Sequence, residues 1–323
     1  MKMSTWNIFV NNFWSWNKWF YPAKPTLPRK PWHPDGDIAF TQLPKERHSL
    51  SSLMIAHLKD TDSTLGGFTV CTGSTVPNSG GKVDGYPLNL AKVSDPKYTI
   101  SKVFAPAKVW ISTGWVSAYG KTVRYVSSMM IQGNPMQDYS DHKLHVFDPV
   151  DRTMSELGEF YDRGSYYLQA RKATQYSLDC SSWDAVGCSV AGLPLSELTL
   201  RYENIVSQGW CQRASMGVVA ASAEFVWPAV ASDGQSTELD APPIGAILKL
   251  KESARTRLTE SGFGRGVCPQ ANAVMDCYSG PGIMIIDSGG HNTTMLEPDY
   301  RWDQKDLSAL KQLTIDDFEV WTL

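Results

Sequence analysis

The chain has 323 residues, of which 42% are hydrophobic and 20% are charged, a composition typical of folded rather than disordered proteins. Its 30 basic and 33 acidic residues give a formal net charge of −3. Because the basic residues form no stripe, nucleic acid is not an expected partner. No apolar run approaches the 18 or so residues of a transmembrane helix, so no membrane span is expected.

The first 21 residues are unusually rich in aromatic side chains. Four of them fall at steps of three and four, which would place them on one face of a helix: Trp6, Phe9, Phe13 and Trp16. Asparagines interrupt every candidate apolar core of a signal peptide, so no signal peptide is expected. Three interpretations stay open: an arm that packs on its own domain, an arm that docks on a neighbouring subunit, and a segment that binds a membrane surface.

A proline-rich stretch follows, with prolines at 22, 25, 28, 31 and 34. This spacing predicts an extended polyproline-II strap. Residues 1–36 are therefore predicted to be an arm and strap that reach away from a β-rich body at 37–323. That body is expected to hold two packed jelly rolls, at about 37–137 and 138–323.

From residue 37 to about 250 the sequence consists mainly of short β-like runs separated by Gly, Pro and Asn. This pattern predicts an all-β fold of jelly-roll or sandwich type, with a double jelly roll as one form of it. Short helices are predicted at 49–58, at 268–277 with Pro269 in its first turn, and at 303–313 with Asp303 as N-cap. The final "DFEVW" is predicted to be an edge or returning strand.

The six cysteines include no CxxC pair, and no histidine lies at zinc-finger spacing from them, so a zinc finger is not expected. Cys180 and Cys188 enclose a loop that a disulfide could close. Cys268 and Cys277 flank a predicted helix that would hold their sulfurs too far apart to bridge, and free buried thiols are the alternative for all six. His142 and His145, close to several aspartates, are interpreted as a surface cluster rather than a metal site. No metal and no cofactor are expected.

The stretch "GPGIMIIDSGGHNTT" (280–294) places Asp287 at the end of a short apolar run. The run 283–286 predicts a buried strand, and Asp-Ser-Gly-Gly is favourable turn chemistry. Asp287 is therefore predicted to cap the strand by accepting hydrogen bonds from the glycine amides that follow. A catalytic role is the alternative.

Several segments occur in a fixed order in the second half of the chain: "GLPLSELTLRYENI", "AEFVWPAVAS", "PPIGAILKLKES", "GIMIIDSGG" and "DYRWDQKDLSALKQLTIDDFEV". This series resembles a family of uncharacterised, secreted, β-rich proteins of soil bacteria that are associated with polysaccharides. The resemblance covers about residues 138–322 and implies a fold more than a reaction. The sequence departs from the family at two histidines. Lys143 stands where the family has its first histidine. The segment "GWCQRASMGVV" (209–219), where the family has its second, contains no histidine.

Two kinds of side chain are candidates for glycan chemistry. Cleavage of a glycosidic bond needs two carboxyl groups, and Glu203, Asp148 and Asp287 are the candidates, in that order. The alternative for Glu203 is a salt-bridge network with Arg201 on one strand face. Aromatic faces stack on sugar rings, and four aromatics near predicted loops are candidates for this role: Trp115, Tyr119, Tyr161 and Trp183.

Together these features favour a structural or recognition subunit of an extracellular or virion assembly, of phage tail or capsid type, that faces a glycan. Its expected partner is another copy or another subunit, held through the N-terminal arm. The alternative is a polysaccharide-cleaving enzyme, a glycoside hydrolase or lyase, that uses paired carboxylates.

Overall fold

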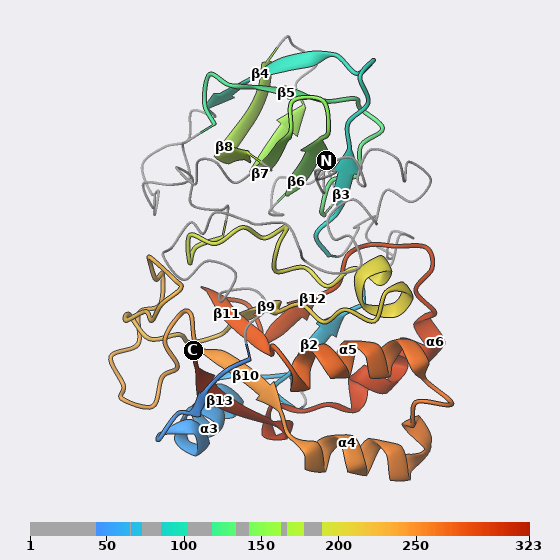
Figure 1. The fold of residues 1–323 in the computed structure, drawn as a ribbon. Coiled ribbons are helices and arrows are strands. Elements are labelled where there is room, and N and C mark those ends of the chain that lie inside the picture. The colour runs from blue at the N-terminus through green and yellow to red at the C-terminus, as the bar shows by residue number, and fades with distance from the viewer. Residues whose placement is uncertain are drawn as a thin grey trace, which may run out of the picture.

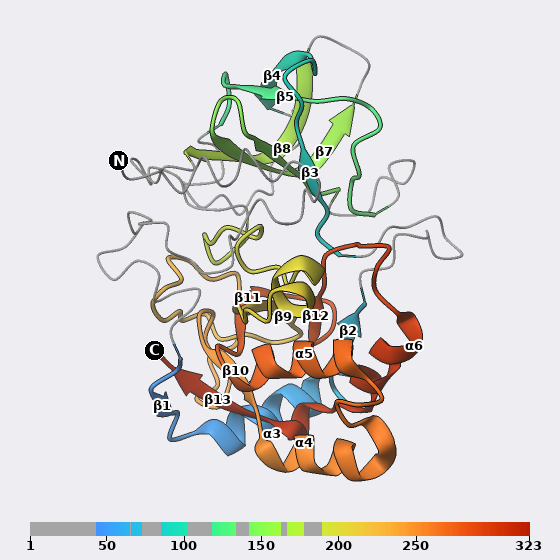
Figure 2. The same ribbon diagram turned by 45° about the vertical axis from the view of Figure 1, so that its right-hand side comes forward.

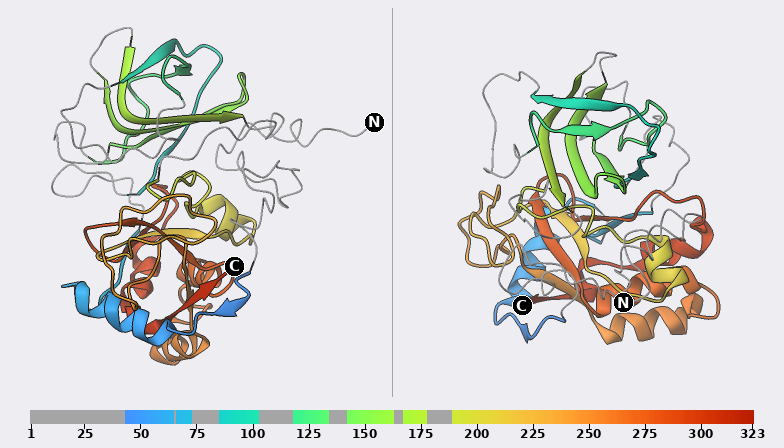
Figure 3. Two further views of the ribbon diagram at one scale, coloured as in Figure 1. Left: turned by 90° about the vertical axis from the view of Figure 1, so that its left-hand side faces the viewer. Right: turned by 45° about the horizontal axis from the view of Figure 1, so that its top comes forward.

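The computed structural model describes residues 43–64, 66–72, 85–102, 118–133, 142–162, 167–177 and 189–323. These residues form two mixed β-sheets and a few short helices. The sheets occupy separate lobes, and residues 189–213, in yellow, run between them (Figures 1 and 2). Figure 3 shows the same two lobes from two further sides.

The first lobe is built on a seven-stranded sheet with the order β1-β13-β10-β11-β9-β12-β2. Its strands are β1 (Glu46–Arg47), β2 (Thr69–Cys71), β9 (Ala214–Val218), β10 (Ile247–Leu250), β11 (Ile283–Ser288), β12 (Thr293–Met295) and β13 (Phe318–Thr322). The apolar run 283–286 forms most of β11 and is buried, as predicted. β11 lies between β10, which it pairs in antiparallel, and β9, which it pairs in parallel.

Helices pack around this sheet. They are α3 (Ser51–Thr61), a π-helical turn (Glu203–Ser207), α4 (Glu252–Leu258), which continues as a π-helical turn (Thr259–Phe263), α5 (Pro269–Ser279), α6 (Gln304–Leu307) and two 3₁₀ turns (Ser308–Gln312 and Ile315–Asp317). The predicted helices near 49–58 and 268–277 are confirmed as α3 and α5. Asp303 is the N-cap of α6, where its carboxylate accepts hydrogen bonds from the amides of Lys305 and Asp306. None of the described helices is both long and apolar enough to cross a membrane.

The second lobe is built on a six-stranded sheet with the order β3-β6-β7-β8-β4-β5. Its strands are β3 (Leu88–Leu90), β4 (Lys97–Lys102), β5 (Thr122–Arg124), β6 (Leu144–Asp148), β7 (Thr153–Asp162) and β8 (Tyr167–Ser177). β6, β7 and β8 form an antiparallel meander. β3 pairs with β6 in parallel, and β4 pairs with β8 in parallel.

The predicted β-rich body is therefore confirmed among the described residues, while its jelly-roll or sandwich form stays a prediction. The two sheets do not divide at residue 137, because β6–β8 pair with β3–β5 rather than with the strands that follow. Each sheet has its own apolar cluster: a large one around β9–β11, α3 and α5, and a smaller one around β4–β8.

Candidate functional site

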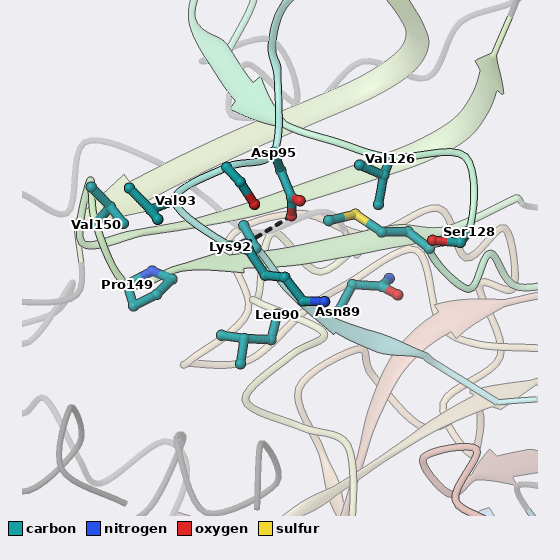
Figure 4. Close-up of a pocket in the computed structure, with 12 residues that line it drawn as sticks. Asn89, Leu90, Lys92, Val93, Asp95, Val126, Ser128, Pro149 and Val150 are labelled. Atoms are coloured by element: carbon teal, nitrogen blue, oxygen red, sulfur yellow. Dashed lines mark hydrogen bonds between the residues drawn. The ribbon is translucent and has the colours of Figure 1, made fainter. Parts of the chain in front are cut away.

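A pocket of about 690 Å³ opens in the second lobe, within the size range of small-ligand sites. Its lining is mainly apolar, and Val93 and Val150 are 72% and 48% exposed at its rim. In Figure 4, Val93, Pro149 and Val150 lie on one side of the pocket and Val126 on the other. The exposed valines make this pocket a candidate for binding an apolar group.

Buried polar groups fix the wall of this pocket. The Asn89 side chain forms two hydrogen bonds with the backbone of Met130, at 2.7 and 2.8 Å. Asp95 accepts a hydrogen bond from the Lys92 amide at 2.7 Å. Arg124 donates to the carbonyl oxygens of Val93 and Asp95. These hydrogen bonds fix the position of the backbone at the pocket wall.

Asp148, one of the predicted catalytic acids, supports this wall instead of facing solvent. It is 3% exposed, and its Oδ2 lies 3.0 Å from Arg124 Nε. Its Oδ1 accepts hydrogen bonds from the amides of Val150 and Asp151 at the end of β6. The carboxylate therefore shapes the turn that carries Pro149 and Val150.

Glu203, the first predicted acid, is also buried. It begins a π-helical turn. The prediction that Glu203 and Arg201 share one face of a strand is therefore wrong. Its Oε2 accepts a hydrogen bond from Arg301 Nη1 at 2.8 Å. Arg301 also binds Asp299 and stacks 4.4 Å from the centre of the Tyr202 ring. Glu203 is 2% exposed, and its catalytic role stays a prediction.

Glu297 lies in the same cluster and was missed by the sequence analysis. It is 1% exposed, and neither carboxyl oxygen accepts a hydrogen bond from the described residues. Arg201 Nε lies 3.9 Å from Oε1. Burial raises the pKa of Glu297 to about 8 against the opposing effect of Arg201, so this carboxyl group is mostly neutral at pH 7.

Asp287, the third predicted acid, forms a pair with Asp233. β11 shifts register against β9 between Ile285 and Asp287, an irregularity that re-aims the next side chain. The Asp287 and Asp233 side chains share a hydrogen bond, and burial together with the Asp287 carboxylate raises the pKa of Asp233 to about 7. Asp233 is therefore partly protonated at neutral pH.

The prediction that Asp287 accepts a hydrogen bond from the Gly289 amide is wrong. The Gly289 amide donates to the Val218 carbonyl at 2.6 Å, and the amide of Ser288 donates to Asp233 Oδ1 at 3.0 Å. Asp233 is placed by a tight turn, because a side chain at Gly234 would meet the Ser222 carbonyl at 2.1 Å. Both carboxyl groups are half-buried and lie at the carboxyl ends of parallel strands, where ligands commonly bind.

A second acid-bearing pair lies at the other end of the β11–β12 loop. His291 Nδ1 is 3.2 Å from Asp62 Oδ1, which also accepts the Thr64 amide at 2.8 Å. The Asn292 amide donates to Asp62 Oδ2 at 2.7 Å. Burial acts to raise the pKa of Asp62, but these hydrogen bonds outweigh it and lower that pKa. The His291 ring is held by an ionised buried carboxylate while about half of its surface stays exposed.

The other predicted site residues fall into two groups. The hydroxyl of Tyr119 donates to the carbonyl oxygens of Ala170 and Arg171, and the ring of Tyr161 packs edge-on against His142. Neither residue lines the described pocket. The remaining predictions lie outside the described residues: the arm residues Trp6, Phe9, Phe13 and Trp16, the aromatics Trp115 and Trp183, and the Cys180–Cys188 pair.

The histidine and cysteine predictions have mixed outcomes. His142 and His145 are each 1% exposed, so the predicted surface cluster is wrong. Burial lowers the pKa of His145 to about 3 and keeps its ring neutral. Cys268 and Cys277 are free thiols at opposite ends of α5, as predicted.

No protein-family model, curated protein or solved structure matches this chain. The resemblance to secreted bacterial proteins stays a prediction from the quoted segments. The functional argument therefore rests on the residues and geometry described above.

Proposed function

We propose that this chain is a structural or recognition subunit of an extracellular or virion assembly. The observation that supports it best is the apolar pocket with exposed Val93 and Val150 at its rim. Two of the three predicted catalytic acids, Asp148 and Glu203, are buried in ion pairs instead of facing a substrate. An apolar pocket on a folded lobe favours partner binding over glycan chemistry, because none of the described residues that line it is aromatic and could stack on a sugar.

The occupant we propose for the pocket is the aromatic arm of a second copy. Residues 1–42 precede the described part of the chain and carry the arm and the prolines. A strap of about 15 residues in polyproline-II form would span roughly 45 Å, enough to reach a neighbouring molecule. Aromatic anchors in apolar pockets are the usual energetic centres of protein interfaces. We also propose a jelly-roll or sandwich arrangement for the β-rich body, which would suit such an assembly.

The mass of the full-length protein in solution tests this function. We expect the wild-type chain to form an oligomer. Val93→Asp should yield single chains, because it places a charge in the apolar pocket, and joint replacement of the four arm aromatics by serine should do the same. Leu239→Asp is the matched control, because Leu239 is 88% exposed and lies outside the pocket. A monomeric wild type would refute the assembly, and an oligomeric Val93→Asp variant would refute the pocket as the docking site.

The second candidate is a polysaccharide-cleaving enzyme, and the Asp233–Asp287 pair is the observation that favours it. Asp233, whose pKa burial and the Asp287 carboxylate raise to about 7, can both donate and accept a proton near neutral pH. The two side chains are in direct contact, closer than the 5 Å or more that separates the carboxyl groups of glycoside hydrolases. The pair therefore suits proton transfer at a single point, as in a lyase.

Cleavage of a panel of polysaccharides tests this candidate. We expect Asp287→Asn and Asp233→Asn each to lower the rate about 100-fold or more, the usual effect of losing an acid–base group. Glu203→Gln should leave the rate unchanged, because Glu203 is buried against Arg301. An inactive wild-type protein, or full activity in both aspartate variants, would remove the enzyme from consideration.

A further inference from the structure

Three potential metal ligands converge between α3 and the segment 219–244. His57 lies on α3, and Glu238 and Asp240 lie far away in the chain. His57 Nδ1 is 3.2 Å from Glu238 Oε2 and 3.5 Å from Asp240 Oδ1. All three ligand atoms lie within 4.8 Å of one another. Only the fold brings them together.

The histidine ring is fixed and directed toward the two carboxylates. His57 is 8% exposed, and its neighbours Met54, Ile55 and Leu58 anchor α3 in the core. Its Nε2 atom has no hydrogen-bond partner among the described residues, so Nδ1 is the nitrogen with a defined environment. The carboxylates lie on the solvent side, where Glu238 is 69% exposed. A ligand from solvent can therefore reach this cluster.

The distances match the spacing of ligands around a shared cation. N–H···O hydrogen bonds have donor–acceptor distances of about 2.7–3.2 Å, so the 3.5 Å contact lies outside that range. The two carboxylates lie at 3.2 and 3.5 Å from the same nitrogen. Tetrahedral zinc, with bonds of about 2.0–2.2 Å to His and carboxylate, holds its ligands roughly 3.3 Å apart. Two carboxylates also balance the charge of a divalent ion.

We propose that His57, Glu238 and Asp240 bind one Zn²⁺ ion, with water in the fourth position. This site goes beyond the proposed function and departs from the expectation of no metal. Zn²⁺ there joins α3 to the segment that also carries Asp233. Because the ion binds only where these elements meet, it stabilises the folded state by mass action.

Titration of the chelator-treated, full-length protein with ZnCl₂ in a calorimeter tests the site. We expect one equivalent to bind and the melting temperature to rise with free Zn²⁺. His57→Gln and Glu238→Gln should each weaken binding about 100-fold and abolish the rise in melting temperature. Glu238 is exposed, so its replacement leaves the fold intact and covers the case in which the His57 variant misfolds.

His291→Gln is the matched control. His291 also lies beside an aspartate, but among the described residues it belongs to no group of three potential metal ligands. This variant should bind Zn²⁺ like the wild type. Absence of Zn²⁺ binding by the wild type, wild-type affinity in both site variants, or loss of binding in His291→Gln would each overturn the proposal. Tighter binding of Ca²⁺ than of Zn²⁺ would overturn the choice of metal.

Discussion

Replacing Asn292 by alanine is expected to destabilise the first lobe on the order of 3–5 kcal/mol. The side chain is fully buried and joins three separate segments. Its Nδ2 donates to the carbonyl oxygens of Leu58 and Gly67, at 2.8 and 2.9 Å, and its Oδ1 accepts the Val219 amide at 3.1 Å. Alanine removes all three hydrogen bonds, and an interior backbone group that loses its partner costs about 1–3 kcal/mol. Leu58 and Gly67 are buried and Val219 is half-buried.

Chemical denaturation of the wild-type and variant proteins measures this loss. His291→Ala, one residue away, is the control. The His291 side chain is about half exposed and contacts Asp62 at 3.2 Å, so its loss should cost less than about 1 kcal/mol. A loss below about 1 kcal/mol in Asn292→Ala would show that the three segments do not depend on this side chain.

Replacing Glu297 by glutamine is expected to change how stability depends on pH. The folded-state pKa is raised to about 8, chiefly by burial, from an ordinary value of 4.5. Folding then favours the protonated form, so the contribution of this group is full below about pH 4.5 and is lost as pH rises toward 8. Glutamine does not titrate, so the variant should escape this loss.

The free energy of unfolding at pH 5 and pH 8 measures this effect. The variant should gain on the wild type by several kcal/mol over that interval, at about 1.4 kcal/mol for each pKa unit. Glu260→Gln removes the same charge from an exposed position and should gain nothing, because water solvates that carboxylate in both states. An equal difference between wild type and Glu297→Gln at both pH values would contradict the prediction.

The parts of the fold that depend on local signals could be predicted from the sequence. An apolar run between glycines indicated β11, Pro269 indicated the start of α5, and Asp303 indicated the cap of α6. α4 was missed, because Glu252–Leu258 follows a strand directly and its short length gives no clear helical period. "DFEVW" is not an edge strand, since β13 lies between β1 and β10. Its position depends on strands far away in the chain.

The candidate site depended on such distant contacts throughout. Asp287 was identified because it ends a strand, but nothing near it in sequence indicates Asp233 as its partner. The Glu203–Arg301 pair and the His57 cluster were missed for the same reason. Local signals identified which acids end strands or begin turns. They could not show that Asp148 is buried while Asp287 is only half-buried.

The order of strands in the first lobe has a consequence for synthesis on the ribosome. All six strands of the second lobe emerge before the first residue of β9, so that sheet can pair while translation continues. β1 must wait for β13, which comes last in the order of the described strands. A chain truncated before Phe318 would lack β13 and leave β1 and β10 without the strand between them.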